Sequence, residues 1–73
     1  MKRVTELALY SEGIIMDITA EVLLRERLLE LGVSPGRTLK VMRRLPLGGP
    51  IIVQAGSLCL ALRLSEAEQV WVQ

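Results

Sequence analysis

The chain has 73 residues, enough for one small domain, and we expect a single domain over residues 1–73. It is 51% hydrophobic and 3% aromatic, with one cysteine and no histidine, which excludes a disulfide framework, a Cys/His zinc site and histidine-based acid–base catalysis. The net charge of +1 argues against a general nucleic-acid binder and gives little electrostatic repulsion between copies.

The N-terminal part of the chain predicts a strand. Leu7 and Leu9 are expected to be core residues, and Ser11–Gly13 is expected to form a turn. Residues 13–18 are apolar and rich in β-branched side chains, which favours a β-strand. Because apolar residues occupy both faces of this strand, we expect it to be buried on both faces or to lie beside a helix.

A helix is predicted over about residues 20–31, where the apolar period changes. Thr19 is a candidate N-cap, and Gly32 suits the C′ position because glycine adopts the left-handed conformation at little cost. Leucines at i, i+4 and i+7 form the stripe expected to face the core: Leu24, Leu28 and Leu31. Three further apolar residues either widen that face or stay exposed for a partner: Val22, Leu23 and Leu29.

The second half of the chain predicts a series of short strands. Ser34–Gly36 is typical of a type II turn, with proline and glycine at its two central positions. Strands are then predicted, separated by turn-forming residues, at 38–45, 51–54 and 58–64. The residues expected to point inward are Leu39, Val41, Ile51, Val53, Leu58, Leu60, Leu62 and Leu64.

The C-terminal part predicts a one-turn helix near 65–69 and a closing strand over 70–72, with Val70 and Val72 inward. Ser65 and Glu68 have the spacing of a capping box. Together the elements indicate a mainly β fold: a small, closed or nearly closed antiparallel barrel of about five strands. We expect the longer helix to cover one side of the barrel, between its first and second strands.

Several segments of the chain resemble the FeoA family. Residues 25–36 resemble its basic, Leu-rich helix with a glycine stop and a small-Pro-Gly turn. Residues 45–51 are similar to its Pro-x-Gly-Asp-Pro-Ile hairpin, although Gly49 stands where the family commonly has Asp. Residues 60–67 resemble its Leu-Ala-Leu-Arg strand leading into a Glu-Ala turn, and the closing strand also matches. No role is carried over for Gly49.

The resemblance implies an SH3-like barrel and a small accessory protein of bacterial ferrous iron uptake. Such proteins are thought to act on the cytosolic, GTPase-bearing part of the membrane transporter FeoB. Similar domains are also fused to iron-dependent repressors. The alternative to an accessory protein of iron uptake is therefore a metal-responsive regulatory domain with weak transition-metal binding. The chain is too short for the repressor domains, and we expect a stand-alone protein. It has no signal-peptide core and no apolar run of about 20 residues, so we expect a cytoplasmic location without membrane insertion.

No cofactor and no metal site are predicted. Divalent iron requires converging imidazole, carboxylate or thiolate groups, and Cys59 has no Cys or His companion. Glu26 and Glu30 lie one helical turn apart and could hold a cation only weakly, so any bound metal is expected to be weak or adventitious. No Ser–His or Cys–His pair and no Gly-x-x-x-x-Gly-Lys loop is present, and we expect no catalysis by the chain itself.

Contact with another protein is the function that the composition favours. By strand alternation, several apolar residues point away from the inward set, and Leu47 lies at a hairpin tip near arginines. The alternative is that the helix covers this second apolar face. The residues expected to bind a partner are Arg25, Arg27, Met42, Arg43, Arg44, Leu47, Ile52 and Trp71. The expected partner is the cytosolic domain of an FeoB-type transporter, and a homo-oligomer is also considered.

The exposed arginines expected from the sequence are compatible with two other functions. One of these arginines could assist GTP hydrolysis by a partner, as activators of GTPases often do. A basic stretch also makes nucleic-acid binding a less favoured alternative: Arg37, Lys40, Arg43 and Arg44. The near-neutral total charge and the shortage of aromatic residues for base stacking argue against it.

Overall fold

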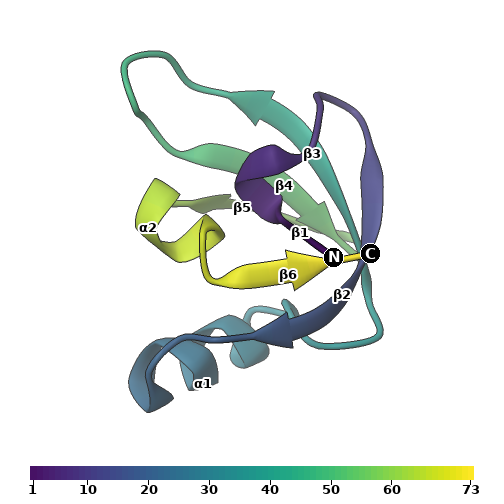
Figure 1. The fold of residues 1–73 in the computed structure, drawn as a ribbon, viewed down its shortest axis with the longest axis vertical. Helices are drawn as coiled ribbons and strands as arrows, with labels where there is room; N and C mark the ends of the chain where they lie inside the picture. The colour runs from purple at the N-terminus through teal and green to yellow at the C-terminus, as the bar shows by residue number, and fades with distance from the viewer.

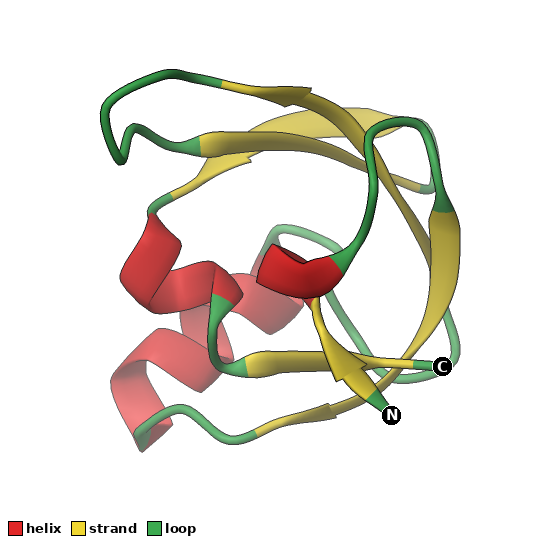
Figure 2. Ribbon diagram, turned by 45° about the horizontal axis from the view of Figure 1, so that its top comes forward, coloured by secondary structure: helices red, strands yellow, loops and turns green.

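In the computed structural model, which describes residues 1–73, six strands form one antiparallel sheet in the order β1-β6-β2-β3-β4-β5. The sheet curls around a central core, and both α-helices lie on one side of it (Figures 1 and 2). The elements are β1 (Lys2–Arg3), the 3₁₀ helix η1 (Val4–Glu6), β2 (Glu12–Ile18), α1 (Val22–Glu30), β3 (Thr38–Arg44), β4 (Ile51–Ala55), β5 (Leu58–Leu62), α2 (Leu64–Ala67) and β6 (Val70–Val72).

The mainly β, antiparallel fold agrees with the prediction, and the structure adds one strand to the five expected. The added strand is β1, in which Lys2 lies opposite Val72 and Arg3 lies opposite Trp71. This pairing joins the two ends of the chain, and Figure 1 shows the termini side by side. A two-residue basic segment carries no strand pattern of its own, so only the presence of β6 makes it a strand.

The core is one cluster of fifteen buried apolar residues inside the curled sheet. Most of the residues predicted to point inward are buried there: Leu39, Val41, Ile51, Val53, Leu62, Val70 and Val72. The predictions for Leu58 and Leu9 are wrong, because their exposed fractions are 46% and 48%. Leu58 follows a hairpin at the sheet edge, and Leu9 lies in a turn. Leu60 is half-buried, and Leu64 begins α2 instead of ending a strand.

Helix α1 packs on the barrel through the predicted leucine stripe, of which Leu28 is fully buried and Leu24 and Leu31 are half-buried. The three apolar residues of α1 outside this stripe are exposed: Val22, Leu23 and Leu29. The prediction of Thr19 as N-cap is wrong, because the helix begins at Val22 with Glu21 as its N-cap. The Thr19 hydroxyl instead accepts a hydrogen bond from Trp71 Nε1 at 3.2 Å.

The predicted ends of helix and turn are confirmed at two glycines. Gly32, with a φ of +93°, follows the C-cap of α1, and its N–H donates to the Leu29 carbonyl at 3.1 Å. The next N–H, of Val33, donates to the Leu28 carbonyl at 2.9 Å, which completes a Schellman motif. Gly36 has a φ of +92°, and the Arg37 N–H donates to the Ser34 carbonyl, as a type II turn requires.

The short helix α2 exists as predicted but begins one residue earlier. Its N-cap is Arg63, whose backbone N–H donates to Glu66 Oε1 at 2.8 Å, so the predicted capping box from Ser65 to Glu68 is wrong. The other carboxylate oxygen of Glu66 lies 3.8 Å from Arg27 Nη1, which links α2 to α1. Neither α1 nor α2 has the length and apolar content that a membrane-spanning helix requires.

The predicted turn at Ser11–Gly13 is wrong, because Glu12 and Gly13 already belong to β2. A Cβ added at Gly13 would lie 2.9 Å from the Val72 Cβ, so the close approach of β2 to Val72 leaves no room for a side chain at this position.

Replacing Gly13 with Ala is expected to lower the free energy of unfolding by about 1–3 kcal/mol, because the added methyl group overpacks the contact with Val72. Urea denaturation followed by circular dichroism measures the change. Replacement of the exposed neighbour Ile14 with Ala is the control, and we expect a smaller loss there. An equal loss at both positions would contradict the packing argument.

Candidate partner-binding surface

The hairpin between β3 and β4 ends in a turn with an unusual residue at its tip. The Leu45 N–H donates to the Pro50 carbonyl, and the Gly49 N–H donates to the Pro46 carbonyl, both at 3.1 Å. Between these bonds, Leu47 and Gly48 have φ values of +60° and +70°. Positive φ at both central residues is the mark of a type I′ turn, in which asparagine followed by glycine is the preferred pair.

Leu47 is therefore both strained and exposed. A bulky side chain in the left-handed region costs on the order of 1–2 kcal/mol relative to the ordinary helical region. The same side chain is 102% exposed, so it gains no burial within the chain in return. Backbone strain of this kind concentrates at binding and switch sites.

A β-bulge places further residues beside the hairpin. Val41 lies opposite Val53, and the next pair along the strands is Arg43 opposite Ile52, so Met42 is the extra residue. Both Met42 and Arg43 therefore stand against Ile52 on the outer face of the sheet. We call Met42, Arg43, Leu47 and Ile52 the hairpin surface. It contains four of the eight residues predicted to bind a partner, all on the hairpin of β3 and β4.

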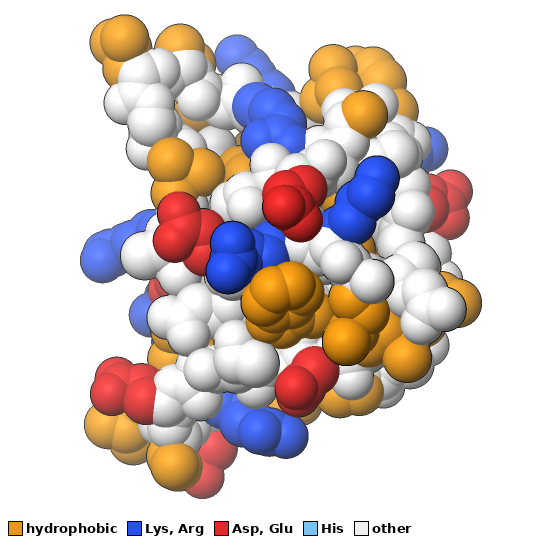
Figure 3. All heavy atoms as spheres, in the orientation of Figure 1, with side chains coloured by type: hydrophobic (Ala, Val, Ile, Leu, Met, Phe, Trp, Pro, Cys, Tyr) orange, Lys and Arg blue, Asp and Glu red, His pale blue; other side chains and the backbone are white.

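A second exposed apolar tip, which was not predicted from the sequence, lies next to β3. In the loop between η1 and β2, Leu9 and Tyr10 are exposed, and Tyr10 has a φ of +65°. The Tyr10 N–H donates to the Val41 carbonyl at 2.7 Å, which holds the loop against β3. Figure 3 shows apolar atoms over both loops at the upper corners, with Lys and Arg atoms between them. The signal available in the sequence was an apolar run, Leu7 to Tyr10, that ends directly before the turn-forming residues Ser11 to Gly13.

Arg44 is exposed, but its guanidinium is engaged within the fold, so we do not count it in the hairpin surface. Its register partner Ile51 is buried, so the Arg44 side chain starts from the inner face of the sheet. Arg44 Nη2 donates to the Thr5 carbonyl at 2.9 Å and to the Leu7 carbonyl. The guanidinium thus ties η1 and the residue that follows it to the end of β3. It also interrupts the predicted basic stretch, because one of its four cations is occupied within the fold.

Replacing Arg44 with Met is expected to lower the free energy of unfolding by about 1.5–3 kcal/mol, because two backbone carbonyls lose a charged hydrogen-bond donor. Thermal and urea unfolding measure the loss. The matched control is replacement of Arg43 with Met, which makes the same chemical change one residue away on the outer face. We expect that control to stay within about 0.5 kcal/mol of the wild type, and equal losses would contradict the bracing role of Arg44.

The other predicted partner-binding residues lie apart from the hairpin surface. Arg25 and Arg27 are exposed on α1, and Arg27 lies near Glu66. Trp71 is half-buried on β6, where the Arg3 guanidinium stacks over its ring at 4.8 Å and its Nε1 donates to Thr19. Trp71 therefore has structural contacts of its own, and its predicted role in partner binding stays a prediction.

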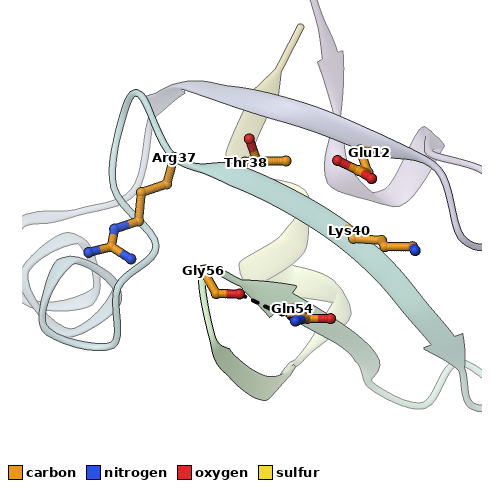
Figure 4. Close-up of a pocket in the computed structure, with 6 residues that line it drawn as sticks. All are labelled: Glu12, Arg37, Thr38, Lys40, Gln54 and Gly56. Carbon is orange, nitrogen blue, oxygen red and sulfur yellow. Dashed lines mark hydrogen bonds between the residues drawn. The ribbon is translucent and has the colours of Figure 1, made fainter.

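A polar hollow of about 430 Å³ lies on the outer face of β2, β3 and β4, lined by Glu12, Arg37, Thr38, Lys40, Gln54 and Gly56. Figure 4 shows the Arg37 guanidinium directed away from the other side chains. Glu12 and Lys40 are register partners of opposite charge on this face. The hollow therefore does not present converging cations to an anion.

The structure gathers no three Asp, Glu, Cys or His side chains into a group that could hold a metal ion. Cys59 is exposed on β5 and has a free thiol. The weak metal binding expected from the sequence stays a prediction.

Comparison with known proteins identifies relatives over almost the whole chain. The family model of the FeoA domain matches residues 2–73. The FeoA protein of Chlorobium tepidum is 37% identical, with a TM-score of 0.91, over 97% of this chain and 68% of that chain. The FeoA of Stenotrophomonas maltophilia, crystallised with zinc and described as a prokaryotic SH3 domain protein, is 31% identical, with a TM-score of 0.86, over 100% of this chain and 91% of that chain.

A further crystal structure, of an iron uptake regulatory protein (FeoA), is 29% identical with a TM-score of 0.89, over 99% of this chain and 95% of that chain. A manganese-dependent transcriptional repressor has a TM-score of 0.89 at 22% identity, over 97% of this chain and 40% of that chain, which shows a shared fold alone. A search of curated proteins gave no significant match. The similarity to the Stenotrophomonas maltophilia structure, which is described as an SH3 domain protein, confirms the SH3-like fold expected from the sequence.

Proposed function

This chain belongs to the FeoA family, which is associated with ferrous iron transport, and we propose that it serves ferrous iron uptake by contacting the cytosolic, GTPase-containing part of an FeoB-type transporter. In this proposal the chain is a cytoplasmic accessory protein that performs no catalysis itself. Its effect on transport is exerted by binding.

The observation that supports the proposal best is the conformation of Leu47. An apolar residue that is fully exposed and held at positive φ lowers the stability of the isolated chain, so its presence is explained by a contact outside it. Burying a leucine side chain against a partner contributes about 1.5–3 kcal/mol. The hairpin surface therefore has the composition of an interface centre, with an apolar anchor and an arginine on the same hairpin.

Of the two arginines at the end of β3, Arg43 is the one on the outer face. It lies opposite Ile52 on the outer face, whereas Arg44 is occupied by backbone carbonyls. In the proposed complex Arg43 contributes a charged rim contact, which affects the association rate more than the final affinity.

The proposal is tested by isothermal titration of the purified cytosolic part of the transporter with this chain, with GTP hydrolysis measured in parallel. We expect saturable binding with a defined stoichiometry. A change in the hydrolysis rate would show that binding of this chain affects the nucleotide site of the transporter. An unchanged rate would show that this chain binds without affecting GTP hydrolysis. Absence of binding with and without nucleotide would contradict the proposal.

We also propose that iron is the cargo of the transporter and is not bound tightly by this chain. The support is the absence of any group of three metal-ligating side chains. Anaerobic calorimetric titration with ferrous ion is expected to give only weak heats without a defined stoichiometry. Tight stoichiometric binding would contradict this expectation.

A further inference from the structure

Strand β5 forms an open edge of the sheet. It pairs with β4 on one side and has no strand on the other. Exposed edges normally carry charges, prolines or bulges that prevent pairing with another chain. The opposite edge follows this rule, because β1 is two residues long and consists of Lys2 and Arg3. The five residues of β5, Leu-Cys-Leu-Ala-Leu, contain none of these features.

The hairpin before β5 determines which of its backbone groups face outward. Gly56 and Ser57 form a two-residue loop, with Gly56 at a φ of +63°. In such a loop the flanking residues Ala55 and Leu58 form a hydrogen-bonded pair, and every second pair along the ladder does the same. The N–H and C=O groups of Cys59 and Ala61 therefore point away from β4. None of the backbone hydrogen bonds outside the regular elements involves these two residues.

We propose that β5 pairs antiparallel with β5 of a second copy of this chain, which continues the sheet across a two-fold axis at Leu60. This register places Cys59 opposite Ala61 of the second copy. Each chain offers two outward N–H and two outward C=O groups, so the pairing forms four hydrogen bonds and leaves none of these groups unpaired.

Charge and side-chain size favour a second copy as the occupant. The net charge of +1 gives little repulsion between copies, and β5 carries no charge that could oppose itself across the axis. Cys59 and Ala61 are small and exposed, so two strands can approach to the usual spacing of about 4.8 Å. Pairing would also cover the exposed side chain of Leu58, which lies opposite Leu62 of the second copy.

Disulfide trapping tests this register, because Cys59 is the one cysteine of the chain. Replacing Ala61 with Cys places a thiol opposite Cys59 of the other copy at a Cα separation of about 5.5 Å, within the range of a disulfide. In the wild type the two Cys59 residues lie diagonally, about 8–9 Å apart, which is too far. We expect the Ala61→Cys chain to form covalent dimers under mild oxidation at least about tenfold faster than the wild type. Equal rates would overturn the proposed register.

Removal of an outward donor tests the pairing itself. Proline is tolerated on an edge strand where its missing N–H faces solvent, so Ala61→Pro should fold but not pair. Sedimentation equilibrium is expected to show a concentration-dependent dimer for the wild type and a monomer for Ala61→Pro. Ala61→Lys is a second variant with the same expectation and no change to the backbone. The proposal would be overturned if the wild type stays monomeric, or if its β5 edge binds only an extended segment of another protein. Binding to the transporter is measured in a separate experiment, so its outcome does not affect this test.

Discussion

Replacing Leu28 with Ala is expected to lower the free energy of unfolding by about 2–5 kcal/mol. Leu28 is 1% exposed and is the one fully buried residue of α1. Its carbonyl also accepts the Val33 N–H that ends the helix. A domain of this size has a total stability of about 4–11 kcal/mol, so the truncation removes a large share of it. Urea denaturation and thermal unfolding measure the loss.

Replacement of Leu29 with Ala is the control for this experiment, because it makes the same chemical change on the exposed side of the same helix. We expect a loss of less than about 1 kcal/mol there. If the two variants lose equal stability, α1 is not anchored to the barrel through Leu28. The helix would then depend on its ends and on the link between Arg27 and Glu66.

Replacing Leu47 with Asn is expected to change stability and binding in opposite directions. Asparagine followed by Gly48 is the preferred pair of a type I′ turn, so the free energy of unfolding should rise by about 1 kcal/mol. Affinity for the cytosolic part of the transporter should fall about tenfold to a hundredfold, because the buried leucine is lost. Denaturation and calorimetric titration of the same preparation measure both effects.

The matched control replaces Leu23 with Gln. Leu23 is 77% exposed on α1 and lies outside the hairpin surface. We expect unchanged affinity for this variant, which separates a specific loss at Leu47 from a general loss of exposed apolar area. Unchanged affinity of the Leu47→Asn chain would exclude the hairpin tip as the anchor. Lower stability of that chain would contradict the strain argument.

Local signals in the sequence predict a large part of this fold. Alternation identifies β3 and β4, where Leu39, Val41 and Val53 are buried as expected. Glycine and proline identify the end of α1 and the type II turn, because positive φ at Gly32 and Gly36 is a local requirement. The exposed position of Leu47 at a hairpin tip also follows from its neighbours, two prolines and two glycines.

The features that the sequence analysis misses depend on distant parts of the chain. Strand β1 exists because Lys2 meets Val72 at the other end of the chain. Arg43 and Arg44 are adjacent, so they point to opposite faces of the sheet, and the bulge at Met42 decides which one is outward. Simple alternation from the buried Val41 would place Arg43 inward, whereas the extra residue places Arg43 outward and Arg44 inward. Neither the amino-acid composition nor the hydrophobic periodicity of a sequence reveals a β-bulge. The set of residues predicted to bind a partner therefore combines residues that the structure separates.

In the proposed complex the hairpin surface is the part of this chain that meets the transporter. The most direct measurement is an amide NMR titration of the labelled chain with the unlabelled cytosolic part of the transporter. We predict that shift changes and line broadening concentrate at Met42–Ile52 and at Leu9 and Tyr10, and leave Arg25 and Trp71 little changed. Changes centred on α1 or on Trp71, with the hairpin unaffected, would contradict the claim.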